Sequence, residues 1–392
     1  MNPALKESHI PVLDGVRGLA ILMVLLFHFW QGVLGYFYPP VFPGIFALWG
    51  HYESIGQKGV DLFFVLSGFL ITGILLRTKG SAHYFKNFYI RRSLRIFPLY
   101  FVVVLVCLAA GTAFSLPPYQ WSQIWSYVVY LQNVVLAFWP ASIGGPQHFW
   151  SLAVEEQFYL FWPLAVFWLS RRQLLWLAMF LVLAAWGARA ACLQVSWDCA
   201  FFFTFCRVDT LAVGALLAIF FSEPARWQPI AVWTRRLAVP IVLVVAATYV
   251  GVAGNPGRFF ADTRSTVYAM FFGAVLVWSL SPGAFNPLPG VFRGSWLRGL
   301  GRISYGMYVF HPFIFHKIMG RFYAATWSPV RGHLWASLTV EWFVCLGGTI
   351  LVAWTSWVFF EHPFIRLKHR FEYETGVPAS LSKVGATEPG KP

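Results

Sequence analysis

The sequence predicts an all-α polytopic membrane protein with about ten transmembrane helices and with both termini in the cytoplasm. Of its 392 residues, 58% are hydrophobic and only 11% are charged. Soluble globular domains carry about a quarter charged residues, so composition excludes a soluble fold. The mean hydropathy of +0.62 and the aromatic content of 19% agree, because aromatic side chains favour lipid-facing surfaces and the membrane interface.

One bilayer crossing requires ~20 mostly apolar residues. Ten segments of the sequence are apolar and have about this length. The segment that contains Arg17 and His28 is weak by hydropathy because of these two residues. It is not expected to be a cleaved signal peptide, since a polar stretch precedes its apolar run and it lacks a small-residue cleavage site. In chain order the ten segments are 11–32, 59–77, 97–115, 149–169, 173–193, 204–221, 237–253, 265–281, 303–320 and 336–360.

Charge predicts the orientation of these helices. The formal net charge of +14 would suggest nucleic acid in a soluble protein, but here the positive-inside rule explains it, and we expect no nucleic-acid partner. With the N-terminus inside, the inner segments hold about 21 of the 29 Lys and Arg. We therefore expect a cytoplasmic N-terminus (1–10), a transmembrane domain (11–365) and a largely disordered cytoplasmic tail (366–392). The predicted location is the cytoplasmic (inner) membrane, as a multi-pass protein.

The five cysteines do not show the spacing of a metal site. Cys192 and Cys199 can form a disulfide on the outer side, although separate packed thiols are the favoured interpretation. The sequence also lacks a metal-ligand motif, a P-loop and a dinucleotide fingerprint, so we expect no metal. Residues 116–147 carry no Asp, Glu, Lys or Arg, and we expect a re-entrant or interfacial segment there, with an ordinary loop or an extra span as alternatives.

Arg17 and His28 raise the first functional question, because charged groups inside a bilayer are costly and often mark function. Eleven residues of helix rise ~16 Å and turn about 1100°, so both side chains lie within roughly 20° on one face. A histidine that is neutral at pH 7 is a candidate general base. Spacing alone equally allows His28 to bond a neighbouring helix while Arg17 snorkels to lipid phosphates.

Further polar residues stand at the ends of other predicted helices. Asp61 opens the second segment, where an N-terminal cap or dipole partner is the favoured interpretation. Gly68 in the same segment allows another helix to approach closely. Arg91 precedes Arg92 and Arg95, which are three residues apart and share a helix face. That pair can hold a phosphate, but on spacing alone a positive-inside flank is favoured.

The stretch around residue 150 contains both acidic groups and a histidine. His148 and Glu155 lie almost two helical turns apart, so they roughly share a face. Adjacent Glu155 and Glu156 cannot both face one way, and Arg207 is a candidate partner for the inward carboxylate. His311 precedes a proline that bends its helix, and is expected to serve structure first and a pocket second.

These blocks together resemble the membrane-bound acyltransferase-3 family, which contains bacterial O-antigen and exopolysaccharide acetyltransferases. The matching stretches extend from residue 13 to residue 364, in the family's order and spacing. They read LDGVRGLAILMVLLFH, GVDLFFVLSGFLITGILL, YIRRSLRIFPLY, HFWSLAVEEQFYLFWP, RISYGMYVFHPF and EHPF.

The resemblance implies a membrane O-acyltransferase that moves an acyl group, by default acetyl from cytoplasmic acetyl-CoA, to a hydroxyl of a surface or lipid-linked carbohydrate. It places His28 as general base or acyl carrier. Glu155, Glu156 or Asp14 would be its acidic partner. It suggests that Arg17, Arg92, Arg95 and Arg91 bind the CoA, and we assign His148, Asp61, Arg207 and His311 to the acceptor.

Alternatives remain at this stage. Some family members carry a fused hydrolase-like domain after the helices. We expect no such domain here, so a separate extracytoplasmic protein is a possible acyl acceptor. A lipid or a small metabolite could replace the carbohydrate. A secondary transporter would also bury charges near the membrane midplane, although we find no repeat. A scaffold of a glycan-assembly complex would not need Arg17 and His28 in the membrane.

Overall fold

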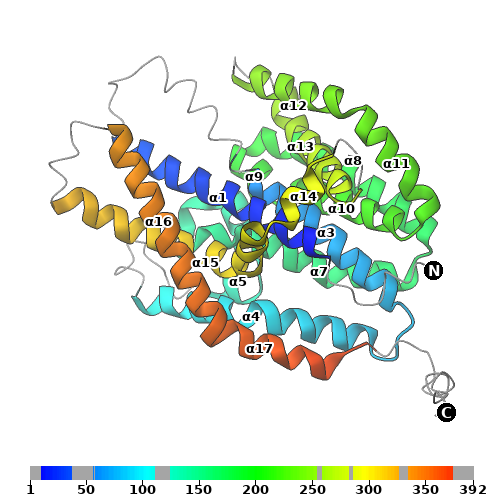
Figure 1. Cartoon of the computed structure of the whole chain (residues 1–392), viewed down its shortest axis with the longest axis horizontal. Coiled ribbons are helices and arrows are strands. Elements are labelled where there is room, and N and C mark those ends of the chain that lie inside the picture. Colours follow the sequence, from blue (N-terminus) through cyan, green and yellow to red (C-terminus); the bar gives the residue numbers. More distant parts are fainter. Residues whose placement is uncertain are drawn as a thin grey trace, which may run out of the picture.

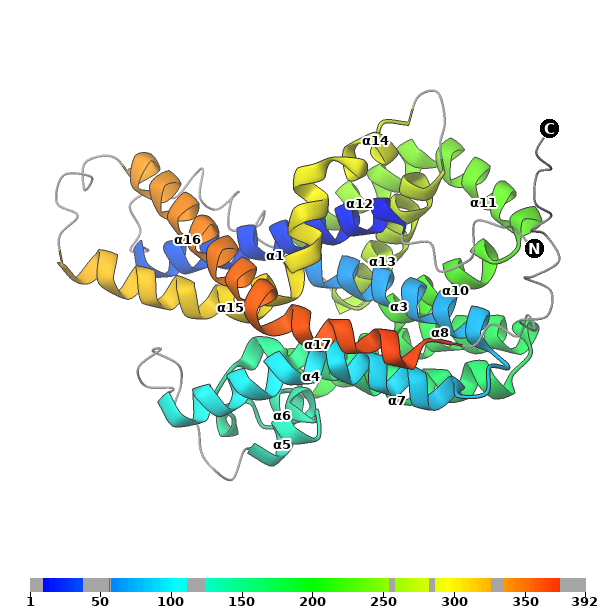
Figure 2. The same cartoon turned by 60° about the horizontal axis from the view of Figure 1, so that its bottom comes forward.

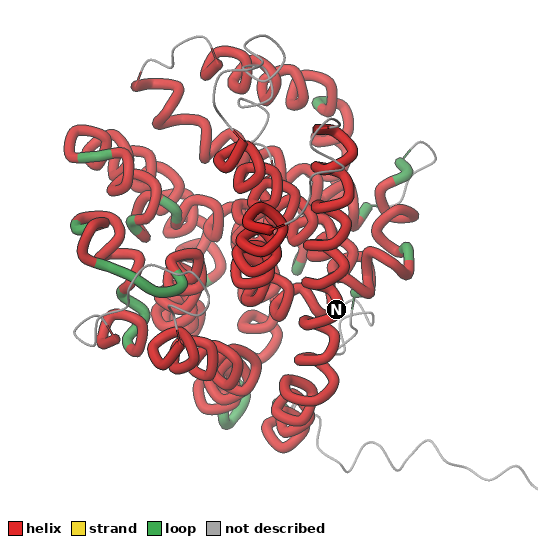
Figure 3. The backbone as a smooth tube through the Cα atoms, turned by 90° about the vertical axis from the view of Figure 1, so that its left-hand side faces the viewer, coloured by secondary structure: helices red, strands yellow, loops and turns green. Residues whose placement is uncertain are grey.

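The computed structural model describes residues 10–37, 56, 58–110, 124–253, 258–281, 286–325 and 334–373. These ranges form a bundle of α-helices and contain no β-strand (Figure 3). The chain is therefore an all-α membrane protein, as the sequence predicts. Each of the ten predicted segments overlaps a helix, although residues 111–115 of the third segment lie outside the described ranges. In chain order these helices are α1 (Pro11–Phe37), α3 (Gly59–Thr78), α4 (Tyr84–Ala110), α7 (Trp150–Trp168), α8 (Arg171–Val195), α10 (Val208–Phe221), α12 (Ala238–Ala253), α13 (Arg258–Leu280), α15 (Ser295–Ala325) and α16 (Leu334–Ser356).

Length and apolar composition identify some of these helices as candidate membrane spans. Five are long and apolar enough by length and composition, in the described part of the chain, and six if the bent pair α11 (Pro224–Arg236) and α12 is one span. The helix α10 is apolar but has only 14 residues. The start of α4 differs from the start of the predicted segment 97–115. Its helix begins at Tyr84 and carries Arg91, Arg92 and Arg95 inside it, whereas the predicted segment begins at 97.

The long helices α1 and α15 pack together and extend from the middle of the bundle to its left-hand edge (Figures 1 and 2). Gly18 faces the backbone of Leu297 at the start of α15, and Gly301 faces the backbone of Asp14. Further along, the ring of Phe29 stacks on that of Phe315 at a centroid distance of 5.8 Å. The small residues thus let α15 cross α1 closely near its start and run beside it afterwards.

The helices α3 and α10 approach each other just as closely. A Cβ atom on Gly68 would overlap the carbonyl oxygen of Leu211, and one on Gly214 would overlap that of Val65. The expected close approach at Gly68 is confirmed. Small residues at such contacts bring two backbones together in membrane bundles, and this contact fixes α10 against α3.

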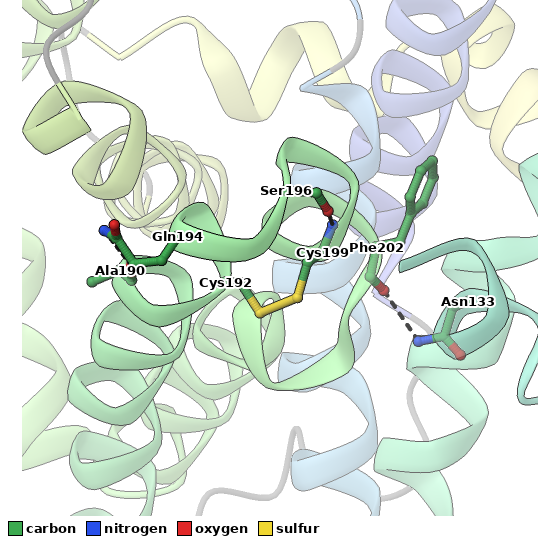
Figure 4. The surroundings of a disulfide bond; sticks show 7 residues. All are labelled: Asn133, Ala190, Cys192, Gln194, Ser196, Cys199 and Phe202. Carbon is green, nitrogen blue, oxygen red and sulfur yellow. Dashed lines mark hydrogen bonds between the residues drawn. A yellow bond between two sulfur atoms is a disulfide. The ribbon is translucent and has the colours of Figure 1, made fainter. Parts of the chain in front are cut away.

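A disulfide joins Cys192, in the last turn of α8, to Cys199 in α9 (Trp197–Phe202) (Figure 4). The Ser196 hydroxyl caps α9 by accepting a hydrogen bond from the backbone N–H of Cys199. The favoured prediction of separate thiols is therefore wrong. A separation of seven residues and the intervening turn bring the two side chains together, which spacing alone does not reveal.

Two further segments frame the bundle. Residues 124–149 form α5 (Ile124–Val128), α6 (Gln132–Phe138), η4 (Pro140–Ser142) and η5 (Gln147–Phe149), none of which is long enough to span a bilayer. Residues 116–123 of the predicted re-entrant segment lie outside the described residues. After α16 the chain continues through η8 (Trp357–Glu361), α17 (His362–Arg366) and η9 (Leu367–Phe371), with α17 beside α4 (Figure 2). The helical structure therefore continues past 366, where the tail is predicted to begin.

We predict that Gly214→Leu destabilises the protein strongly. The new side chain would overlap the Val65 carbonyl and push α10 away from α3, at a cost of about 3 kcal/mol. Thermal unfolding of the detergent-solubilised protein measures the effect as a lower Tm. Gly187→Ala in α8 is the matched control, because nothing lies near a Cβ there. An unchanged Tm for Gly214→Leu would contradict the close contact.

Candidate active site

A narrow cavity of about 100 Å³ lies between α1, α3, α4, α7 and α15. Four of the residues that the sequence singles out line it, namely Arg17, Arg92, Arg95 and Glu155. The structure thus joins motifs that are far apart in the chain. The other polar side chains of the wall are Ser67, Ser151, Tyr159, Ser304, Tyr305 and Tyr308.

One face of α7 runs the length of this cavity. Ser151, Glu155 and Tyr159 follow one another at intervals of four residues, and all three line the wall. Such an interval places side chains on one helix face, and eight residues of helix rise about 12 Å. The adjacent Glu156 points elsewhere, and its Oε1 atom is buried without a hydrogen-bond partner in the described part of the chain.

Positive charge gathers at the Tyr159 end of the cavity. The guanidinium of Arg92 lies 5.4 Å from the centroid of the Tyr159 ring, and Arg17 and Arg95 are close enough to interact electrostatically. Nη1 of Arg17 lies 3.6 Å from Oδ1 of Asp14. Over the described ranges, neither Arg92 nor Arg95 forms an ion pair with a carboxylate. Since an uncompensated charge away from water is costly, this end is suited to an anionic ligand.

The acidic group of the cavity belongs to this cationic end. The hydroxyl of Tyr159 donates to Oε2 of Glu155 at 3.1 Å, and it shares a second hydrogen bond with the hydroxyl of Ser67. Glu155 also interacts electrostatically with Arg92 and Arg17. The carboxylate therefore helps to hold the tyrosine in place beside the arginines.

The opposite end of the cavity leads to a histidine. The hydroxyls of Ser151 and Tyr308 are hydrogen-bonded at 2.6 Å, and the Tyr308 hydroxyl donates to the backbone carbonyl of His148. The ring of His148 bonds in turn through Nε2 to the carbonyl of Val309, at 3.2 Å. His148 is thus fixed where α7 begins, against the middle of α15.

Three histidines meet at this end, and we call them the histidine cluster: His28, His148 and His311. The ring centroids of His28 and His311 are 4.8 Å apart, and those of His148 and His311 are 5.5 Å apart. The sequence selects all three residues but does not reveal that they are in contact. His28 is half-buried, whereas His311 is fully buried.

Backbone carbonyls determine which ring nitrogens carry the protons. Nδ1 of His28 bonds to the carbonyl of Val24 at 2.8 Å, and Nδ1 of His311 bonds to that of Tyr308 at 2.7 Å. A carbonyl only accepts, so both Nδ1 atoms donate. In the neutral rings, Nε2 is then the basic nitrogen. Nε2 of His311 is buried without a hydrogen-bond partner in the described part of the chain.

No carboxylate forms a hydrogen bond or ion pair with His28 in the ranges described. Asp14 pairs with Arg17, Glu155 accepts from Tyr159, and the ring of His28 is oriented by its own helix through Val24. The predicted acidic partner of His28 is therefore replaced in this geometry by a backbone carbonyl.

Arg207 pairs with Asp61, and the expected partnership of Arg207 with Glu155 or Glu156 is wrong. Nζ of Lys58 lies 3.7 Å from the other carboxylate oxygen of Asp61, and the indole of Trp150 covers the Arg207 guanidinium at 5.5 Å. All of these groups are buried. The pair joins the start of α3 to the start of α10. Asp61 therefore links two helices, in addition to standing in the first turn of α3 as predicted.

A second buried pair escapes the sequence analysis. Nη1 of Arg189 lies 2.9 Å from Oδ2 of Asp209, and Thr266 donates to the same oxygen at 2.7 Å. The signal for this pair in the sequence is Arg189 itself, a charged residue within the predicted span 173–193. The wall residues Ser151, Tyr159 and Tyr308 were also missed, although each stands within a stretch that carries a predicted site residue.

The Arg91 guanidinium lies apart from the cavity wall and donates from Nη1 to the carbonyls of Lys368 and Phe371, both at 3.2 Å. It therefore holds the end of the described chain against α4. Among the described residues, no group of His, Cys, Asp and Glu side chains is arranged to hold a metal ion.

Comparison with known proteins identifies the family. Residues 10–358 match the sequence model of the acyltransferase-3 family, described as an acyltransferase domain. Because this match covers nearly the whole chain, the protein belongs to the acyltransferase-3 family. No solved structure matches.

Curated relatives agree with this placement. The chain is 28% identical to the peptidoglycan O-acetyltransferase OatA of Listeria monocytogenes, over 78% of this chain and 49% of the relative. It is 25% identical to a Staphylococcus aureus protein assigned as an O-acetyltransferase, over 92% of this chain and 58% of the relative. It is 32% identical over 40% of its length to a Bacillus subtilis protein assigned as a peptidoglycan O-acetyltransferase, of which 24% is covered. The chain thus spans about half the length of the first two.

We predict that Arg207→Met lowers the free energy of unfolding by about 3 kcal/mol, because it leaves the buried Asp61 carboxylate without its main partner. The double variant Asp61→Asn, Arg207→Met should recover much of this loss, since neither charge then remains unpaired. Thermal unfolding measures both effects.

The same double variant tests the predicted role of the pair in acceptor binding. Recovered stability together with wild-type turnover shows a structural pair. Recovered stability with lost turnover would instead show that the pair contacts the acceptor. A double variant as unstable as Arg207→Met would contradict the ion-pair argument.

Proposed function

We propose that this acyltransferase transfers an acetyl group from acetyl-CoA to a hydroxyl of a cell-envelope carbohydrate. The observation that carries the proposal is the cavity, which has the guanidinium groups of Arg17, Arg92 and Arg95 at one end and the histidine cluster beyond the other. The relatives whose names specify peptidoglycan O-acetylation support a glycan acceptor, and the group of three guanidinium side chains in the cavity wall supports an anionic donor.

The cationic end is suited to the phosphates of CoA. Guanidinium groups bind phosphate through strong, charge-assisted hydrogen bonds. Arg92 and Arg95 have no carboxylate partner to displace among the described residues, while Arg17 stands beside them and is balanced by Asp14. The pantetheine arm is long and thin, so it could follow α7 from Tyr159 towards Ser151 and Tyr308 after these side chains widen the cavity.

His28 is the proposed reactive residue. With Nδ1 bonded to Val24, Nε2 can take the proton from an acceptor hydroxyl as its oxygen attacks the thioester carbon and the CoA thiolate leaves. Alternatively, Nε2 attacks the thioester carbon first, and the CoA thiolate leaves, which forms an N-acetyl-imidazolium on His28. The acceptor oxygen then attacks the acetyl carbon, Nε2 is released as the neutral imidazole, and the hydroxyl proton passes to the thiolate. The second route moves only the acetyl group across the membrane. His148 and His311 would position the acceptor in both routes.

Residues at the two ends of the bundle support the proposed orientation of the protein in the membrane. Lys79 of α3 donates to the carbonyl of Leu169, and Arg171 pairs with Glu223, so these residues mark one end. The Asp61–Arg207 pair and the disulfide Cys192–Cys199 lie at the other end of the same helices. Disulfides persist in oxidising compartments. This supports an outward-facing disulfide, with Lys79 and Arg171 on the cytoplasmic side. Ten spans, cytoplasmic termini and residence in the inner membrane belong to the same proposal.

We predict that His28→Gln lowers kcat for acetyl-CoA-dependent acetylation by at least about 100-fold, while acetyl-CoA binding persists. Gln keeps a polar side chain but cannot act as the base or acyl carrier. The measurement is thiol release from acetyl-CoA by the purified protein with a cell-wall glycan extract. His83→Gln is the control, because His83 is exposed before α4. Full turnover in the His28 variant would sink the assignment.

We also predict that Arg92→Gln and Arg95→Gln each raise KM for acetyl-CoA about tenfold, since each removes a charge-assisted contact to phosphate. Initial rates over a range of acetyl-CoA concentrations measure this. Arg77→Gln is the matched control, because Arg77 is exposed near the end of α3. Unchanged KM in both cavity variants would show that the anion site serves something else.

A further inference from the structure

The last described segment of the chain lies against the cationic end of the cavity, and we call it the C-terminal strap (residues 361–373). Its backbone is held by α4: Arg91 donates to the carbonyls of Lys368 and Phe371, and Asn87 donates to that of Glu372 at 2.9 Å. The Arg91 guanidinium also lies 5.5 Å from the centroid of the Tyr373 ring. These three hydrogen bonds from side chains of α4 to the backbone of the strap hold it along that helix.

This anchoring brings the side chain of Lys368 to the arginines of the cavity. Lys368 is half-buried and interacts electrostatically with Arg95, Arg92 and Arg17 as well as with Arg91. In the described part of the chain it forms no ion pair with a carboxylate. Folding therefore adds a further positive charge where several already repel one another, which costs stability unless an anion binds.

The beginning of the strap contributes the opposite charge at a different place. The Glu361 carboxylate accepts a hydrogen bond from Ser356 at 3.0 Å and interacts electrostatically with Arg95. It is buried beside Gly306 of α15. Glu361 therefore steadies the start of the strap against α15 and Arg95, and it forms no ion pair with Lys368.

We propose that Lys368 is a further binding residue for the phosphate groups of the acyl donor, and that the strap places it at the cytoplasmic mouth of the cavity. This inference rests on the proposed acetyl-CoA-dependent function. CoA carries a diphosphate and a separate phosphate monoester. Arg92 and Arg95 offer two planar groups for bidentate contacts, and a lysine adds a flexible point charge that binds phosphate well.

The experiment uses the full chain in a phospholipid-free detergent and measures the dissociation constants of acetyl-CoA and of acetyl-pantetheine, which lacks every phosphate. We expect Lys368→Ala to raise the constant for acetyl-CoA about tenfold and to leave that for acetyl-pantetheine unchanged. Lys368→Arg should retain tight binding. Arg370→Ala removes the same charge from an exposed neighbour on the strap and should have no effect.

Several outcomes overturn the inference. Equal losses for both donors would show that Lys368 only supports the fold, and unchanged acetyl-CoA binding would show that it serves no phosphate of the donor. An effect that appears only when phosphatidylglycerol is added would assign Lys368 to a lipid headgroup. If the wild-type protein binds acetyl-pantetheine but not acetyl-CoA, or neither, the proposed function fails and this inference fails with it.

Discussion

The cost of removing a charge from water governs this bundle. A buried ion costs several kcal/mol unless a partner of opposite charge and further hydrogen bonds compensate it. Asp61 with Arg207 and Arg189 with Asp209 meet this requirement inside the protein, so they tie helices together. Arg92 and Arg95 do not meet it within the described chain. This difference separates the charges that join helices from those that have no carboxylate partner among the described residues.

The paired charges give the cavity its frame. The Asp61–Arg207 contact and the packing of Gly68 against Leu211 both join α3 to α10, one by charge and one by close approach. Trp150 covers Arg207, which fixes the start of α7 at the same end of the bundle. Because α7 is held there, its face with Ser151, Glu155 and Tyr159 must run back towards the arginines of α4.

The sequence predicts much of this arrangement and misses a definable part. Apolar length locates the helices, and helical periodicity identifies residues that share a face, as with Arg92 and Arg95. Periodicity does not say which helix packs against that face, and therefore Arg207 was assigned to the glutamates although it pairs with Asp61. The contact between His28 and His311 depends on how α15 crosses α1, which local sequence does not determine.

The two ends of the candidate active site are separated by a similar distance along α1 and along α7. Arg17 and His28 are eleven residues apart in α1, a rise of about 16 Å, while Ser151 and Tyr159 span about 12 Å along α7. Arg17 and Tyr159 thus stand at the cationic end of the site, and His28 and Ser151 stand at the end near the histidine cluster, where α15 adds Tyr308 and His311. A donor held by its phosphates at one end can present a reactive carbon only at the far end of an arm of this length. For the proposed donor, whose phosphates would bind at the arginines, the spacing favours chemistry at the histidine cluster.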